Sequence, residues 1–191
     1  MCSSDLGITL GALDRSAEEI AAYEDLISRF GSSDAAPMQE RVAKALVNKG
    51  ATLGALDRSA EEIAVYDDLI ARFGQSDAAR LQVQVAMAMF NKGITLGALD
   101  RSAEEIAVYD DLISRFGTSD AAPLQEQVAM AQYNKGCVFA RQGRVYACIE
   151  ALNHWAEIRG GFACEMIAND RDFDSIRAKP KFAKYLEDKG C

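Results

Sequence analysis

The stretch that decides the fold is residues 50–74, "GATLGALDRSAEEIAVYDDLIARFG", because it returns almost unchanged at residues 7–31 and 93–117. Gly7, Gly50, Gly93 and Gly136 follow one another at intervals of 43 residues, and residues 50–92 match residues 93–135 at 36 of 43 positions. A repeat of 20–50 residues is typical of stacked architectures, in which each unit buries its apolar face against its neighbours.

Within this stretch, residues 59–73 are predicted to form an amphipathic helix. Ser59 is the expected N-cap, Glu62 closes a capping box, and Gly74 ends the helix. An apolar stripe at spacings of three and four follows one side of the helix: Ile63, Tyr66, Ile70 and Phe73.

A longer helix is predicted to follow, from a cap at Asp77 to about Leu99, with Asp34 and Asp120 as the equivalent caps. Pro37 and Pro123 then fall in the first turn, where a missing N–H costs little. Gly50, Gly93 and Gly136 lie inside these helices, where glycine costs roughly 1 kcal/mol relative to alanine. We therefore expect the partner helix to approach closely at the glycines.

Two antiparallel helices per unit predict an all-α fold, an α-solenoid. The segments "NKGATLGALDRSAEEIAVYDDLI" and "YNKGCVFARQGRVYACIEAL" resemble the tetratricopeptide repeat family over residues 7–160. The resemblance implies a right-handed superhelix that binds peptides on its concave face. The unit is longer than the family's roughly 34 residues. Lys49, Lys92 and Lys135 also replace a large apolar residue of the family pattern, and Glu19, Glu62 and Glu105 replace a small one.

The two ends of the chain depart from the repeat. Residues 161–191 are predicted to form a helical cap after the Gly160–Gly161 break, and "NDRDFDSIRAKPKF" resembles the segment that ends bacterial arrays of this family. Residues 1–6, "MCSSDL", match no equivalent segment and correspond to a translated sequencing adapter. We therefore expect a non-native leader on a truncated array, with Leu10, Leu13, Ile20, Tyr23 and Ile27 facing an unfilled gap.

Composition limits the classes of partner and compartment. The net charge of −8 argues against a nucleic-acid partner, whose phosphates require clustered Lys and Arg. An apolar run of about 20 residues, as a membrane-spanning helix needs, does not occur. The five cysteines lack a C-x-x-C motif, which predicts reduced thiols and a cytoplasmic protein.

Residues that could carry chemistry have structural explanations, so we predict no enzyme activity, no cofactor and no metal. Asp170, Asp172 and Asp174 imitate the start of a calcium loop, but Ser175 and Lys181 stand where glycine and a bidentate glutamate are needed. His154 is the only histidine, which excludes a multi-histidine site. Cys137 and Cys148 are predicted to be packed in the core.

Function is then expected on the long helices, where one asparagine recurs two residues before each glycine. A row of amides could bond a peptide backbone, flanked by Met and basic side chains. The candidate peptide-binding residues are Asn48, Asn91, Asn134, Lys44, Met87, Phe90, Met130, Tyr133 and Arg141. In the alternative, each asparagine bonds only to the neighbouring helix or loop.

The leading hypothesis is a protein-interaction scaffold that binds a peptide or partner protein without catalysis. A second hypothesis is a regulatory or sensing segment of a larger protein whose active domain lies upstream. A third is self-association through the N-terminal end, which lacks a capping helix.

Overall fold

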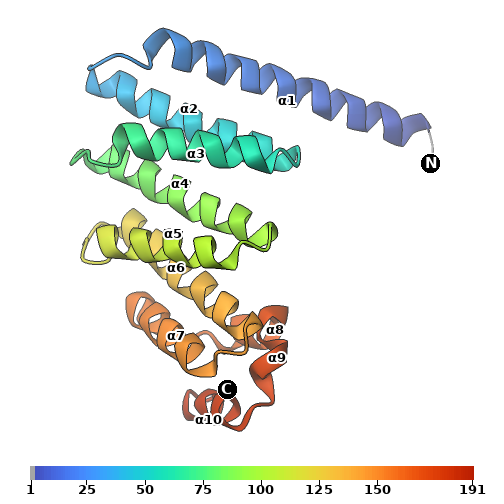
Figure 1. Ribbon diagram of the computed structural model, residues 1–191, viewed down its shortest axis with the longest axis vertical. Helices are drawn as coiled ribbons and strands as arrows, with labels where there is room; N and C mark the ends of the chain where they lie inside the picture. The colour runs from blue at the N-terminus through green and yellow to red at the C-terminus, as the bar shows by residue number, and fades with distance from the viewer. Residues whose placement is uncertain (1–2) are drawn as a thin grey trace. The chain divides into compact units, whose positions relative to one another are not determined.

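A computed structural model describes the backbone of residues 3–191 and the side chains of residues 15–191. These residues form helices and no strand, and they divide into two compact units, residues 1–95 and 96–191 (Figure 1). The boundary falls inside a helix and not at the predicted start of the cap. Each unit is described by itself below.

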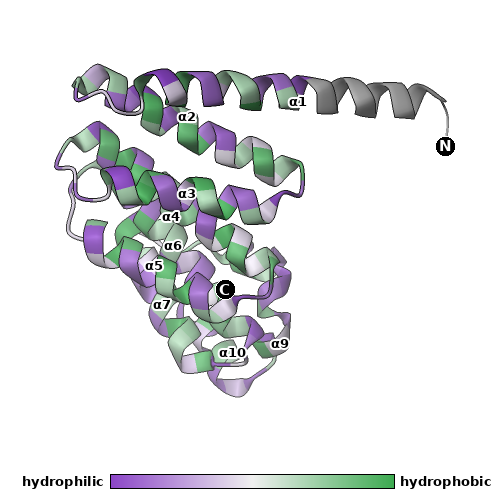
Figure 2. Cartoon of the chain, turned by 45° about the horizontal axis from the view of Figure 1, so that its top comes forward, coloured by the Kyte–Doolittle hydropathy of each residue, from purple (hydrophilic) through white to green (hydrophobic). Residues whose placement is uncertain are grey.

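The first unit contains α1 (Ser3–Phe30), α2 (Ala36–Ala55), α3 (Ser59–Phe73) and most of α4 (Ala79–Ala98). Consecutive helices pack together, α1 on α2 and α2 on α3. Hydrophilic and hydrophobic residues alternate around α3, as an amphipathic helix requires (Figure 2). Tyr66 and Leu69 are completely buried, whereas the predicted stripe residues Ile63 and Ile70 are half-buried.

The repeated lysines form ion pairs with the preceding helices. The Nζ atom of Lys49 on α2 lies 2.8 Å from a carboxylate oxygen of Glu24 in the preceding helix, α1. Lys92 pairs in the same way with Asp67 at 2.5 Å, and Lys135 in the second unit pairs with Asp110 at 2.5 Å. Each lysine thus ties its own helix to the helix that precedes it in the chain.

Glycine allows the close helix approach that the sequence predicts. A Cβ atom added to Gly50 would lie 2.3 Å from the Tyr66 ring, and one added to Gly54 would lie 2.8 Å from the Glu62 carboxyl group. The completely buried Tyr66 ring has little room to move, so a side chain at Gly50 would disturb the packing of α2 on α3. The flexible Glu62 side chain, by contrast, could move away from one at Gly54. At Gly136 the nearest atom, in Leu152, is 3.4 Å away, and the approach is looser.

The helix caps differ from the prediction. The residue before α3 is Arg58 and makes no side-chain cap, and Glu62, the expected capping-box residue, turns inward with only 8 % of its surface exposed. The predicted caps Asp34 and Asp120 are also wrong, because α2 and α6 begin after Ala35 and Ala121. Burial against Gly54 holds Glu62 in the core, where it cannot reach the backbone at the helix start.

The first copy of the repeat does not bend where the other two do. Asp57 and Asp100 adopt φ of 57° and 58° in the turns that follow α2 and α4. Asp14, the equivalent residue, lies within the uninterrupted α1. Ile20 is buried against the neighbouring helix, so the expectation that it faces a gap is wrong, while Tyr23 and Ile27 are half-buried. Leu10 and Leu13 lie outside the described side chains.

The second unit contains α5 (Ser102–Phe116), α6 (Ala122–Arg141) and α7 (Val145–Arg159), followed by the predicted cap. The cap consists of α8 (Cys164–Asn169), the 3₁₀ helix η1 (Arg171–Phe173), α9 (Asp174–Arg177) and α10 (Pro180–Asp188). Gly160 adopts φ of 70° and ends α7 at the predicted break. Four apolar cap residues are buried against α6 and α7, as expected: Ile167, Phe173, Ile176 and Phe182.

A disulfide between Cys164 and Cys191 closes the cap, so the prediction of reduced thiols is wrong for these two residues. Their separation of 27 residues in the sequence gave no sign that α8 and the end of the chain meet. Cys137 and Cys148 are buried and free, as predicted. Disulfides persist mainly in oxidising compartments, and the bond therefore removes the argument from thiols for a cytoplasmic location.

Candidate functional site

Asparagines of the long helices contact the preceding short helices. The Nδ2 atom of Asn134 donates a hydrogen bond to the Tyr109 hydroxyl at 3.1 Å. Asn91 lies near the Tyr66 hydroxyl, whose pKa is raised chiefly by burial, but by distance and angle no hydrogen bond joins them. At Asn134 the structure therefore shows the alternative in which the amide bonds to the neighbouring helix.

Tyr133 and Arg141 hold the C-terminal cap. The Tyr133 side chain is 6 % exposed, its ring centroid lies 5.2 Å from that of Trp155, and its hydroxyl donates to Asp170 at 2.7 Å. Arg141 donates to Asp172 at 2.6 Å and to Glu105 at 3.2 Å. Both side chains are thus engaged within the second unit, Tyr133 in the core and Arg141 with 40 % of its side chain still exposed.

The remaining candidate residues lie on α2, α4 and α6. In the first unit Lys44 is exposed on α2, Asn48 is half-buried on the same helix, and Met87 and Phe90 are half-buried on α4. Met130 is half-buried on α6. The structure therefore does not gather the nine candidates into one site.

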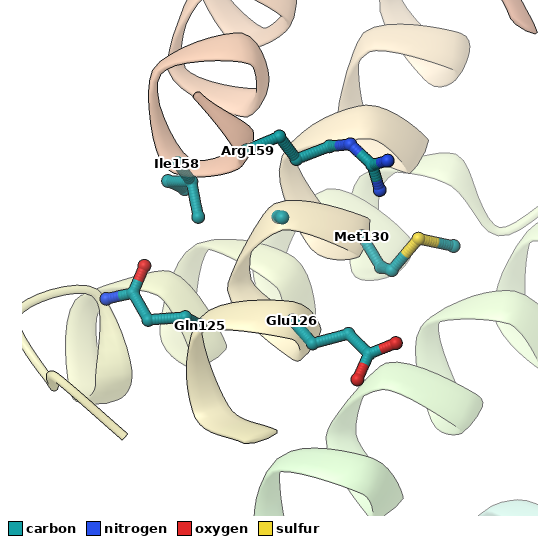
Figure 3. Close-up of a pocket in the computed structure, with 6 residues that line it drawn as sticks. Gln125, Glu126, Met130, Ile158 and Arg159 are labelled. Carbon is teal, nitrogen blue, oxygen red and sulfur yellow. The ribbon is translucent and has the colours of Figure 1, made fainter. Parts of the chain in front are cut away.

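A hollow of about 260 Å³ lies between the start of α6 and the end of α7. Figure 3 shows Met130 and Ile158 at this hollow, with Arg159 above Met130 and Glu126 below it. The other lining residues are Gln125 and Ala129. Apolar carbon atoms thus form part of the surface, and one acidic and one basic side chain flank it.

Ile158 and Arg159 were not predicted as site residues. Both stand at the end of α7, a short helix, whereas function was expected on the long helices. The sequence signal for them is an apolar residue followed by a basic one, just before the Gly160–Gly161 break. These two residues are in the last turn of α7, which lies beside the start of α6.

A second, more polar hollow of about 200 Å³ lies further along the same two helices. Lys135, Arg144, Glu150 and the exposed His154 are among its lining residues. The guanidinium of Arg144 lies 4.4 Å from the centre of the Phe139 ring. Lys135 is already paired with Asp110. Arg144 and Lys135, two cationic side chains of this hollow, therefore already have partners within the chain.

The described residues that could hold a cation together are Cys137, Asp170 and Asp172, whose ligand atoms lie within 4.8 Å of one another. Asp170 already accepts hydrogen bonds from the Tyr133 hydroxyl and the Asp172 backbone, and Arg141 supplies a positive charge to Asp172. Burial, followed by the charge of Asp170, raises the pKa of the Cys137 thiol. The arrangement favours a neutral thiol in a network that fastens the cap to α6.

Nucleophilic chemistry at the other free thiol is disfavoured as well. Burial raises the pKa of Cys148 to about 12. A thiolate is the reactive form of cysteine, and such a pKa leaves very little of it at neutral pH.

Comparison with known proteins gives no relative: no protein-family model matches the chain, and neither curated proteins nor solved structures show a significant match. Among the described helices, none combines the length and the apolar character that crossing a bilayer would require.

Proposed function

We propose that the chain is a non-catalytic interaction scaffold, a tetratricopeptide-like α-solenoid that binds a peptide or partner protein. The observation that supports this function best is the hollow beside Met130, a residue that the sequence places on the ligand-facing side of the long helices. The resemblance of the repeats to a peptide-binding family points in the same direction.

The size of the hollow favours a side chain over a cofactor. Sites for small molecules usually enclose roughly 300–1,000 Å³. A volume of about 260 Å³ suits one or two apolar side chains of an extended peptide. Met130 adapts to such a side chain because its thioether is flexible and polarisable.

Charge at the two sides of the hollow would orient the peptide. The Arg159 guanidinium lies 5.6 Å from the centre of the buried Trp155 ring, and this contact restricts its position. An acidic peptide residue would pair with Arg159, and a basic one with Glu126. Further residues of the peptide would follow the long helices toward Asn134, and we expect a dissociation constant in the micromolar range, about −8 kcal/mol.

The test begins with a random peptide library displayed on phage and selected against the whole chain. Synthetic copies of the enriched peptides are then titrated in fluorescence anisotropy. Met130→Glu places a charge in the apolar part of the hollow, and we expect at least a tenfold loss of affinity, about 1.4 kcal/mol.

Tyr146→Glu is the matched control, because Tyr146 lies on α7 with 74 % of its surface exposed and outside the lining. Its affinity should equal that of the parent chain. Selection without any enriched peptide, or equal binding by the Met130 variant, would contradict the proposal.

A further inference from the structure

One face of α1 is open although the same residues are buried elsewhere in the first unit. This face, which we call the Tyr23 face, consists of Glu19, Tyr23, Leu26 and Phe30. The equivalent residues of α3 are all buried: Glu62, Tyr66, Leu69 and Phe73. Phe30 is 40 % exposed and Phe73 only 7 %, Glu19 is exposed, and Tyr23 and Leu26 are half-buried. The residues are nearly the same in α1 and α3, so their different exposure comes from the helices that surround them and not from the sequence.

The helix that covers α3 shows what the Tyr23 face requires. α2 covers it through Gly50, which meets the Tyr66 ring, and Gly54, which meets the Glu62 carboxyl group. α2 and α3 run antiparallel here, because the contact moves from Gly50 to Gly54 along α2 while it moves from Tyr66 back to Glu62 along α3. The partner of the Tyr23 face should therefore be an antiparallel helix with two glycines four residues apart.

The chain contains such a segment at residues 7–13, "GITLGAL", with glycines at positions 7 and 11. These correspond to Gly50 and Gly54. In the other copies a turn at Asp57 or Asp100 folds the glycine segment back onto the next short helix. α1 continues straight through Asp14 from Ser3 to Phe30 (Figure 1). A straight helix cannot cover its own Tyr23 face.

We propose that a second copy of the chain covers this face, so that two α1 helices pair antiparallel in a symmetric dimer. Gly7 and Gly11 of each copy then meet Tyr23 and Glu19 of the other. Residue 15 is midway between residues 7 and 23 and also midway between residues 11 and 19. The two-fold axis therefore passes beside Arg15, and each contact between the two copies occurs twice. Dimers of this kind arise when identical elements are exchanged across a hinge. The dimer does not depend on the proposed peptide-binding function.

The first test measures the mass of the chain by light scattering after size exclusion, in a Cys2→Ser background that prevents a disulfide between the N-terminal ends. We expect a mass close to twice 20.7 kDa. Gly11→Leu places a bulky side chain at the contact with Glu19 and should reduce the mass to that of one chain. Ala21→Leu adds the same bulk at an exposed position of α1 off the Tyr23 face and should leave the dimer intact.

Circular dichroism verifies that each variant keeps its helices. A parent chain that is monomeric at tens of micromolar would overturn the proposal, as would a Gly11→Leu variant that remains dimeric. A monomer would indicate either that residues 7–13 fold back on their own α1 or that a longer helix from another unit is needed.

The second test examines the register and does not depend on weakening the dimer. Arg15→Cys in the Cys2→Ser chain places two exposed thiols beside the axis, and a short bis-maleimide should join them into a covalent dimer. Ala21→Cys should remain unlinked because residue 21 of one copy faces residue 9 of the other. The native cysteines do not interfere, as two are buried and two form the disulfide. A dimer that links equally well through both positions, or through neither, would exclude this pairing.

Discussion

The two units bury the same glutamate–tyrosine pair in different ways. In the second unit Glu105 pairs with Arg141 at 3.2 Å, and the Tyr109 hydroxyl accepts a hydrogen bond from Asn134. In the first unit Glu62 forms no ion pair with any residue that the structure describes, and the buried Tyr66 hydroxyl has no hydrogen-bond partner there. Burial raises the pKa of both carboxyl groups as the largest effect.

The same pair of repeat residues therefore has a different cost of burial in each unit, because residues outside the repeated stretch supply its polar partners. Arg141 stands in the last copy where Ala98 stands in the copy before it. Tyr133 likewise replaces Phe90 and gains a bond to Asp170. The cap and the altered α6 thus supply polar partners to the second unit.

The largest expected difference between the units comes from the disulfide. Cys191→Ser should cost the second unit about 3 kcal/mol, because a closed loop of this length restricts the unfolded chain. Hydrogen exchange should accelerate at α8 and α10 and remain unchanged at α2 and α3. Cys2→Ser serves as the control. Equal acceleration in both units would show that the cap stabilises the whole chain.

The next difference concerns the two glycines. Gly50→Ala should destabilise the chain by about 1–3 kcal/mol, because the completely buried Tyr66 ring cannot give way to a Cβ atom 2.3 Å from it. Gly136→Ala meets Leu152 only at 3.4 Å and should be neutral or stabilise by up to about 1 kcal/mol through helix propensity. Urea unfolding of both variants measures the contrast, and equal losses would refute the difference in helix approach.

A smaller difference is expected from the buried carboxyl groups. A raised pKa means that the folded state holds its proton longer, so Glu62 lowers stability as the pH rises from its ordinary value of 4.5 through the folded pKa. Glu62→Gln should remove this decline and stabilise the chain by about 1 kcal/mol at pH 7.

Glu105→Gln is the matched variant, and it should stabilise the chain less than Glu62→Gln at pH 7, because Arg141 offsets part of the cost of burying the Glu105 charge. Thermal unfolding between pH 4 and 8 measures both. Equal stabilisation by the two substitutions would mean that the pair with Arg141 contributes nothing.

The smallest difference involves single hydroxyl groups. Tyr109→Phe should cost about 0.5–1.5 kcal/mol through the lost bond with Asn134. Tyr66→Phe should be neutral or slightly stabilising, because it removes a buried hydroxyl that has no partner among the described residues. Chemical denaturation of the two variants at pH 7 provides the comparison, and a larger loss for Tyr66 would reverse it.

Periodicity predicted much of the local fold. The ends of α3 and α10, the break at Gly160 and the apolar residues of the cap follow from spacing and from glycine and proline, which act within a few residues. The close approach at Gly50 was also predicted, because a glycine inside a helix has a cost that packing must offset.

The candidate site was predicted less well. Asn134, Tyr133 and Arg141 lie on a helix that was expected to face a ligand, yet their partners Tyr109, Asp170 and Asp172 lie 25–37 residues away in the sequence. Ile158 and Arg159 join Met130 only because α7 returns along α6. Sequence spacing carries no information on such contacts.

The sequence by itself determined that the chain is built from helices, where most of them end, and which side of each is apolar, because backbone hydrogen bonds and amphipathic spacing are local. Only the tertiary structure decided that Glu62 turns inward, that Cys164 meets Cys191, and that α1 leaves its Tyr23 face open. These outcomes depend on which residues, far away in the sequence, bury a given side chain. The free energy of a carboxyl group, a thiol or an aromatic ring changes only when such residues remove it from water.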